Sequence, residues 1–229
     1  ASIPIPGVQQ LDGMTTDNDG NLYVVDSIND LIFKVELATQ NVELFIQDGL
    51  EDFLQDVIFD EANTRIAVAY WLANAPIDAF DLSTGEKTRL LNSSPGKYDG
   101  ISIDQEGSFY FASHHGIGEI YKYPNDFSSQ PELIASNFDE PSGLDFNKFE
   151  NVLAIPTYAG SSVDFIQLNT NTFYLEPYFS TEFTTGHAPF SVRFEGNAIS
   201  KPDVTRWGWD FNNDGNIDSD LGCITFYCR

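Results

Sequence analysis

The sequence is poor in positive charge and holds no long apolar run. Its 229 residues include 11 lysines and arginines against 35 aspartates and glutamates, a formal net charge of −24 at pH 7. A chain this acidic repels phosphate backbones, so we expect no nucleic-acid partner. No apolar run approaches the length that spans a bilayer, so we expect no membrane insertion. The acidity is typical of a well-solvated surface or of a calcium-loaded protein.

Cysteine is almost absent as well. Only Cys223 and Cys228 occur, both close to the end of the chain. In an oxidising compartment they would close a small disulfide loop, whereas in the cytosol they would remain thiols. Neither has the spacing with histidine that zinc sites use. The sequence leaves their pairing open.

What the sequence does contain is a pattern that recurs about every 43 residues. Gly13, Gly100 and Gly143 mark three copies, and a copy without the glycine covers residues 55–58. Each copy holds short runs rich in Val, Ile, Phe and Tyr between Asp, Asn and Gly turns, which predicts strands. About four strands fit one period, at residues 14–17, 22–26, 31–37 and 42–46 in the first copy. Four antiparallel strands in such a repeat make one blade of a β-propeller.

We therefore predict an all-β chain with propeller repeats over residues 1–177. Four blades are recognisable, at about residues 11–50, 51–96, 97–139 and 140–177. Residues 1–10 look like an outer strand that precedes a blade. Four blades can close a ring, but the pattern also suits part of a six-bladed ring, with further domains of the same polypeptide. A two-sheet sandwich with coincidental spacing is the alternative.

A different pattern follows over residues 178–229. Gly186–Pro189, an alternating run at 190–194 and Trp207–Phe211 resemble the start of a PKD domain, an immunoglobulin-like β-sandwich of secreted proteins. The resemblance covers about residues 180–220. It implies a partial PKD-like sandwich on an extracellular protein of a bacterial cell surface.

The same region offers oxygen donors for a cation. Side-chain oxygens recur at short intervals around Gly215, and the segment resembles an EF-hand-type calcium loop. The EF-hand acid at the twelfth position is replaced by Leu221. An ordinary hairpin turn is the alternative. The donors are Asp210, Asn212, Asp214 and Asp218.

In each blade the residue before the repeat glycine opens the innermost strand and is expected to face the central channel. These residues are Asp12, Asp56, Asp99 and Ser142. Three acids around one axis repel one another unless a cation or protons neutralise them. The run Tyr98–Ile101 resembles the SMP-30/gluconolactonase and NHL-type propellers. That resemblance implies a divalent cation, most simply calcium, with Asp99 as a ligand and Asp12 and Asp56 at related positions.

The loops beside this ring carry aromatic side chains. The first two strands of a blade are antiparallel, so the second strand ends where the first begins. This places Trp71, His114, His115 and Tyr158 around the acids. Aromatic rings beside acids suit a carbohydrate or another small polar ligand.

Three functions remain open at this stage. We favour a secreted cell-surface recognition module that binds a small-molecule or glycan ligand, or calcium, at the propeller mouth. The second is a metal-dependent lactonase of the SMP-30 class, with Asp99 and Asp56 as catalytic candidates. The third is a non-catalytic adhesin scaffold. The sequence shows no nucleophile elbow that would support a serine hydrolase.

Overall fold

The computed structural model describes residues 2–47, 49–168, 174–181, 190–201, 208–210, 216–219 and 223–228. The chain divides into two compact units, Ala1–Asn169 and Thr170–Arg229. Its described elements are strands and a short 3-10 helix, Glu61–Asn63. Among these residues no helix has the length and apolarity needed to cross a membrane.

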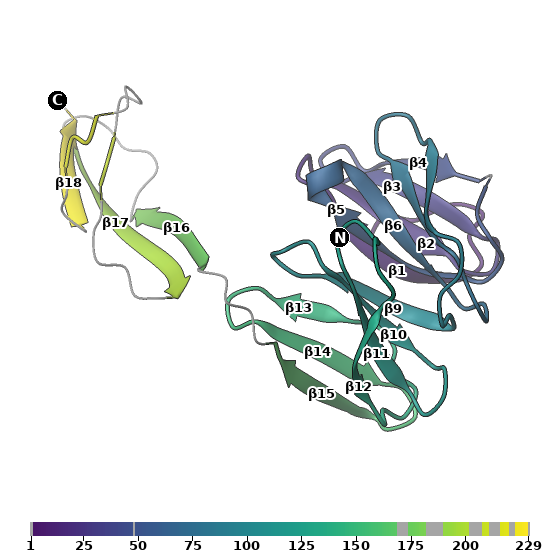
Figure 1. Ribbon diagram of the computed structural model, residues 1–229. Helices are drawn as coiled ribbons and strands as arrows, with labels where there is room; N and C mark the ends of the chain where they lie inside the picture. The colour runs from purple at the N-terminus through teal and green to yellow at the C-terminus, as the bar shows by residue number, and fades with distance from the viewer. Residues whose placement is uncertain are drawn as a thin grey trace. The chain divides into compact units, whose positions relative to one another are not determined.

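The first unit consists of four antiparallel sheets that follow one another in chain order (Figure 1). This confirms the prediction of an all-β chain with four propeller-like blades. Each sheet is a meander in which every strand pairs with the next one along the chain. The strands are β1 (Leu11–Thr16), β2 (Asn21–Asp26), β3 (Leu31–Glu36) and β4 (Asn41–Ile46); β5 (Leu54–Asp60), β6 (Arg65–Tyr70), β7 (Ile77–Asp81) and β8 (Lys87–Leu91); β9 (Tyr98–Ile103), β10 (Phe109–Ser113), β11 (Glu119–Tyr123) and β12 (Glu132–Ser136); and β13 (Asp145–Asn147), β14 (Val152–Thr157) and β15 (Ser162–Gln167).

The start of the chain differs from the prediction. The first strand begins at Leu11 rather than at residue 14, because a bulge before Met14 lets Leu11 pair with Asp26. Residues 2–10 form no strand. Instead, the backbone N–H groups of Gln9 and Gln10 donate to the buried carboxylate of Asp26, at 3.0 and 3.1 Å. The Asp26 carboxylate, together with a backbone hydrogen bond from the N–H of Ser27 to the carbonyl oxygen of Gln10, therefore holds the end of this segment.

The fourth blade also differs, because its sheet has three described strands instead of four. The repeat predicts the fourth strand close to residue 174. There the chain forms β16 (Tyr174–Thr181), which pairs with β17 (Phe190–Lys201) from Tyr174↔Lys201 to Thr181↔Phe194.

The second unit contains one described sheet, in the order β16-β17-β18, with β18 at Cys223–Cys228. A second sheet, which a PKD-like sandwich requires, is not among the described residues. The PKD-like sandwich therefore stays a prediction, and so does a domain boundary between residues 177 and 178. Cys223 and Cys228 pair in the ladder with Glu195 and Phe190, and whether the two thiols are joined stays open.

The core of the first unit lies between successive blades. Apolar side chains from the face of one sheet pack on the next sheet in three separate clusters, as expected for stacked units that cannot bury their own faces. Buried members of these clusters include Tyr23, Ile32 and Tyr70 between the first two blades; Phe109, Phe111 and Tyr123 between the second and third; and Tyr110, Ile120 and Leu153 between the third and fourth.

The forward face of the fourth blade is not covered in the same way. Ile32 pairs with Val25 and Ile120 pairs with Ala112, and both isoleucines are fully buried under the next blade. Val163 holds the corresponding position opposite Pro156, yet it is 53% exposed. The described residues of the first unit therefore leave this sheet face open.

Glycine allows the inner strands to approach one another closely. Inner strands β1, β5, β9 and β13 contact one another in that order. A Cβ atom added at Gly13 would lie 1.9 Å from Oδ1 of Asp56, and one added at Gly100 would lie 2.4 Å from the carbonyl oxygen of Ser142. No side chain fits at either position. The repeat glycines thus set the spacing at which Asp56 and Ser142 sit against the preceding blade.

Candidate functional site

One hydrogen bond recurs in all four blades and brings the predicted loops together. The residue after the second strand donates its backbone N–H to the carbonyl oxygen of a residue just before the first strand. The antiparallel geometry predicts this arrangement, and it gathers these loops at one end of the inner strands. The pairs are Ser27 to Gln10 at 3.0 Å, Trp71 to Phe53 at 2.8 Å, His114 to Lys97 at 3.0 Å and Tyr158 to Glu140 at 2.8 Å.

Asp56 is the acid most affected by its surroundings. Its Oδ2 accepts a hydrogen bond from the backbone N–H of Ile101 at 3.0 Å, and its Oδ1 accepts one from Val57 at 2.8 Å. Burial raises the pKa of this carboxyl to about 7, the two hydrogen bonds lower it, and the negative charges of Asp99 and Asp12 raise it further. Asp56 is therefore poised to gain or lose a proton near neutral pH.

The other two acids belong to the same cluster. Burial raises the pKa of Asp12, the Gln10 side chain opposes this at 3.4 Å, and the charge of Asp99 adds to the rise. The three aspartates that the sequence aims at the channel thus lie within electrostatic reach of one another. Ser142 adds no charge, and its backbone N–H donates to the carbonyl oxygen of Pro156 at 2.9 Å.

The described side chains do not fit a metal ion held by all three acids. Within the described ranges no three His, Cys, Asp or Glu side chains are gathered closely enough to hold a cation. Both oxygens of Asp56 already accept backbone hydrogen bonds. Because the pKa of Asp56 is raised to about 7, protonation of Asp56 below neutral pH would relieve the mutual repulsion in this cluster, which is one of the two remedies that the sequence suggests.

The second predicted cation loop is described only at its ends. Trp209 and Ser219 form an isolated β-bridge, and the backbone N–H of Trp209 donates to Ser219 at 2.7 Å. Asp210 and Asp218 flank this bridge. Asn212 and Asp214 lie outside the described residues, so calcium binding by this loop stays a prediction.

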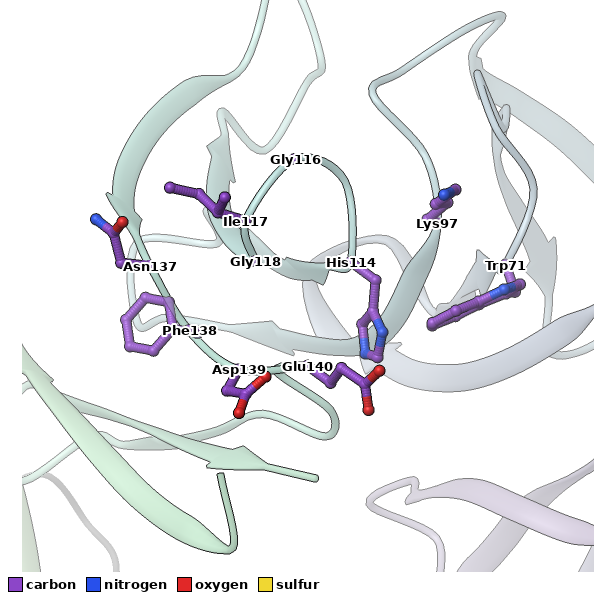
Figure 2. Close-up of a pocket in the computed structure, with 10 residues that line it drawn as sticks. All are labelled: Trp71, Lys97, His114, Gly116, Ile117, Gly118, Asn137, Phe138, Asp139 and Glu140. Carbon is purple, nitrogen blue, oxygen red and sulfur yellow. The ribbon is translucent and has the colours of Figure 1, made fainter. Parts of the chain in front are cut away.

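A cavity of about 610 Å³ opens at the mouth, between the loops of the second and third blades and the entry to the fourth. Its volume lies within the usual range for small-molecule sites, roughly 300 to 1,000 Å³. Figure 2 shows Trp71 and Lys97 on one side, Asn137 and Phe138 on the other, and His114 between them. The lining residues are Trp71, Lys97, His114, Gly116, Ile117, Gly118, Asn137, Phe138, Asp139 and Glu140.

His114 connects this cavity to the acid cluster. Its ring meets Trp71 edge-on, with ring centroids 4.2 Å apart and planes at 72°. The Nε2 atom of His114 is buried and makes no hydrogen bond, and Oδ2 of Asp99 lies 3.5 Å from it. Burying a nitrogen without a hydrogen-bond partner costs free energy unless a ligand or a water molecule supplies the missing hydrogen bond. Asp99 thus lies close to His114 and also affects Asp56 through its charge.

Two of the predicted rim residues lie outside the cavity. His115 is exposed, and its Nδ1 lies 3.1 Å from Oε2 of Glu119. Tyr158 is 79% exposed and does not line the cavity. The sequence places the loops correctly but does not fix the direction of each side chain. Gly116 and Gly118, both with positive φ, turn the chain sharply after His115.

Sequence reasoning missed several lining residues, Lys97 and Glu140 among them. A usable signal exists, because Phe53, Lys97 and Glu140 occupy one repeat position just before the inner strand. All three have positive φ and accept the recurring hydrogen bond. Comparing that position between the copies would have identified both residues.

Asp56 lines a second cavity of about 440 Å³ that runs along the inner strands. Its walls mix small polar and apolar side chains from all four blades. They include Met14, Thr15, Ile101, Ser102 and Asp145. Of the acid cluster, Asp56 lines this channel cavity, whereas Asp99 contacts His114, which lines the mouth cavity.

Comparison with solved structures supports a β-propeller fold for these blades. A gluconolactonase from Xanthomonas campestris superposes with a TM-score of 0.58 at 17% identity, covering 69% of this chain and 57% of that one. The calcium-binding protein regucalcin from Agrobacterium tumefaciens gives 0.56 at 13%, covering 71% and 55%. A chain of a nidogen/laminin complex gives 0.59 at 15%, covering 83% and 75%.

The relatives found by sequence comparison are lactonases. The chain is 24% identical over 196 residues to lactonase drp35 of Staphylococcus haemolyticus, covering 80% of this chain and 59% of the relative. It is 24% identical over 202 residues to lactonase drp35 of Staphylococcus epidermidis, covering 82% and 61%. The chain thus spans about three fifths of the length of these curated relatives. No family model matches it.

Proposed function

We propose that this chain forms part of a lactonase-type propeller and hydrolyses a small lactone at its mouth. The observation that carries the proposal is the carboxyl of Asp56, whose pKa is raised to about 7 beside Asp99, which in turn faces His114 across 3.5 Å. The similarity to staphylococcal lactonases supplies the reaction class. This replaces ligand recognition as the favoured function.

In the proposed reaction Asp56 transfers a proton and His114 stabilises the oxyanion. The carboxylate of Asp56 accepts a proton from water while the water oxygen attacks the lactone carbonyl. The ring C–O bond then breaks, and the proton returns from Asp56 to the departing ring oxygen, which leaves a hydroxy acid. A carboxyl with a pKa near the working pH is well suited to both transfers. His114 donates a hydrogen bond to the oxyanion.

Hydrolysis of δ-gluconolactone, followed by acid release at constant pH, tests the proposal. The wild type should exceed the buffer rate, and Asp56→Asn should lower kcat by about 100-fold or more, as expected for loss of a general base. Asp99→Asn should also abolish turnover. Asp145→Asn removes an acid from the same channel cavity and should retain the rate. A wild type no faster than buffer, or a fully active Asp56→Asn protein, would refute the proposal.

Calcium remains part of the proposal. One structural relative is described as calcium-binding, whereas the described side chains of this chain do not gather as a ligand set. Melting in millimolar calcium and in EDTA decides the matter, since a ligand that binds only the folded state raises Tm. A shift that is lost in Asp99→Asn would support a cation at the mouth. No shift would contradict both predicted cation sites.

Ligand recognition without turnover is the second candidate. The contact between Trp71 and His114 beside Asp139 and Glu140 suits a polar ring with hydroxyl groups. This fold also occurs in a protein–protein complex, so the fold by itself does not imply catalysis. A glycan array would favour recognition if it found a ligand in a protein that hydrolyses no lactone. An extracellular, cell-surface location stays a proposal, and protease treatment of intact cells would test it.

A further inference from the structure

Lys97 is exceptional among the basic residues of this acidic chain. Among the lysines and arginines whose side chains the structure describes, it alone makes no ion pair, hydrogen bond or ring contact. An ammonium group in a chain with a net charge of −24 would ordinarily find an acid. The other basic residues contact partners: Lys34 pairs with Glu43, Arg65 with Asp60, Lys87 and Arg89 with Asp78, Lys122 with Asp104, and Lys148 lies over the ring of Phe149.

The backbone fixes Lys97 at the rim of the mouth cavity. Its N–H donates to the carbonyl oxygen of Leu72 at 2.7 Å, and its own carbonyl accepts from His114 at 3.0 Å. Its φ of 51° is unfavourable for lysine, and the same backbone conformation occurs at Phe53 and Glu140. The repeat therefore determines the backbone conformation at this position, whereas a lysine occurs there only in the third blade.

The cavity that Lys97 lines has two chemically different walls. On one side are Lys97, Trp71 and His114, whose Nε2 is buried and makes no hydrogen bond. Asp139 and Glu140 line the cavity as well and offer only hydrogen-bond acceptors when ionised. A ligand that satisfies both walls carries an anionic group together with hydroxyl groups.

We propose that Lys97, together with His114, binds the carboxylate of a small hydroxy acid in this cavity. The inference deepens the proposed function and rests on it, because opening a lactone yields such a molecule. Water adds its oxygen to the carbonyl carbon, the ring C–O bond breaks, and one water proton ends on the ring oxygen as a hydroxyl group. The other proton leaves to solvent, and the carboxylate appears beside Lys97.

Calorimetric titration of the whole chain with gluconate and with sorbitol tests this inference. The two probes share their hydroxyl groups, and only gluconate carries a charge. Gluconate should bind about tenfold or more tightly than sorbitol, and Lys97→Met should lose about the same factor, as expected for a hydrogen bond to a charged group. Lys97→Arg should recover much of the binding. Lys148→Met makes the same charge change outside the cavity and should bind gluconate like the wild type.

Three outcomes would overturn the inference: gluconate does not bind, gluconate and sorbitol bind equally, or Lys97→Met binds gluconate unchanged. Product inhibition separates this result from the proposed hydrolysis. If lactone is hydrolysed but gluconate inhibits Lys97→Met as strongly as the wild type, the carboxylate site is wrong and the hydrolase stands. If gluconate binds through Lys97 and no lactone is hydrolysed, the site stands and the hydrolase is wrong.

Discussion

The backbone N–H of Ile101 donates a hydrogen bond to Oδ2 of Asp56 across 3.0 Å, which joins the inner strands of the second and third blades. The same carboxyl has a pKa of about 7. A residue that holds two blades together is therefore also the residue that titrates near neutral pH. The Asp56 side chain therefore both joins two blades and, in the proposed mechanism, transfers the proton.

The pH dependence of stability should report on Asp56. Its folded pKa of about 7 lies above the value of about 4 in an unfolded chain. The folded state therefore binds the proton more tightly, and its stabilising contribution is present below about pH 4 and is lost as the pH rises through 7. Asp56→Asn should remove this slope. Asparagine loses one acceptor, so at pH 5 the variant should be less stable by about 1 kcal/mol.

Thermal unfolding between pH 5 and pH 8 provides the measurement. The loss of stability on going from pH 5 to pH 8 should be smaller in Asp56→Asn than in the wild type. Parallel curves for the two proteins would show that Asp56 does not titrate in this range. Asp145→Asn is the control, since Asp145 is exposed in the same cavity.

Gly13→Ala should unfold the protein or destabilise it by several kcal/mol, because its methyl group would lie 2.5 Å from the Cα of Asp56. Gly143 holds the same repeat position in the fourth blade, and nothing lies within 4 Å of a Cβ placed there. Gly143→Ala should be nearly neutral. Urea denaturation of both variants checks this, and equal losses would contradict the spacing role of Gly13.

Truncating equivalent core positions should give unequal costs. Ile120→Ala removes a fully buried side chain between the third and fourth blades and should cost about 2–5 kcal/mol. Val163→Ala changes a side chain that is 53% exposed and should cost less than about 1 kcal/mol. Chemical denaturation compares the two. A large loss at Val163 would mean that the forward face of the fourth blade is covered in solution.

Breaking a buried ion-pair network in the second blade should cost more stability than breaking a surface ion pair. The fully buried Asp78 accepts from Arg89 at 2.5 Å and Tyr70 at 3.2 Å, and Lys87 lies 3.0 Å away. Asp78→Asn removes the buried charge and leaves Arg89 and Lys87 with Glu51 as their acidic partner, and it should cost about 3 kcal/mol. Glu43→Gln breaks the exposed pair with Lys34 and should cost under about 1 kcal/mol. Similar Tm values for the two variants would contradict this assignment.

The four rim residues that the sequence predicts should differ in how much their substitution weakens ligand binding. Trp71→Ala and His114→Ala remove the cavity wall and should weaken gluconate binding about tenfold or more. His115→Ala and Tyr158→Ala act outside the cavity and should leave it unchanged. Titration of the four variants checks the assignment. Weakened binding in Tyr158→Ala would place the ligand elsewhere on the mouth.

Much of the fold can be predicted from the sequence because the repeat is strong. The strand pattern around Leu22–Asp26 returns at Phe109–Ser113, and the structure places β2 and β10 there. The outer strand predicted at residues 1–10 is wrong, since residues 2–10 form no strand. The backbone N–H groups of Gln9 and Gln10 instead donate hydrogen bonds to the Asp26 carboxylate. The sheet of the fourth blade has three strands among the described residues, and β16 pairs with β17. Both differences involve contacts between residues well separated in the sequence, which a short local pattern does not specify.

The sequence by itself determined the blades, the glycine spacing between them and the gathering of Asp12, Asp56 and Asp99, because these follow from a short local pattern repeated in register. Only the tertiary structure decided which of those acids has a pKa of about 7, since the pKa of Asp56 depends on burial and on neighbours from two other blades. It also decided that His114 lines the cavity while His115 does not, and that Lys97 has no acidic partner among the described residues. Such relations depend on the direction of single side chains, which a repeat does not specify.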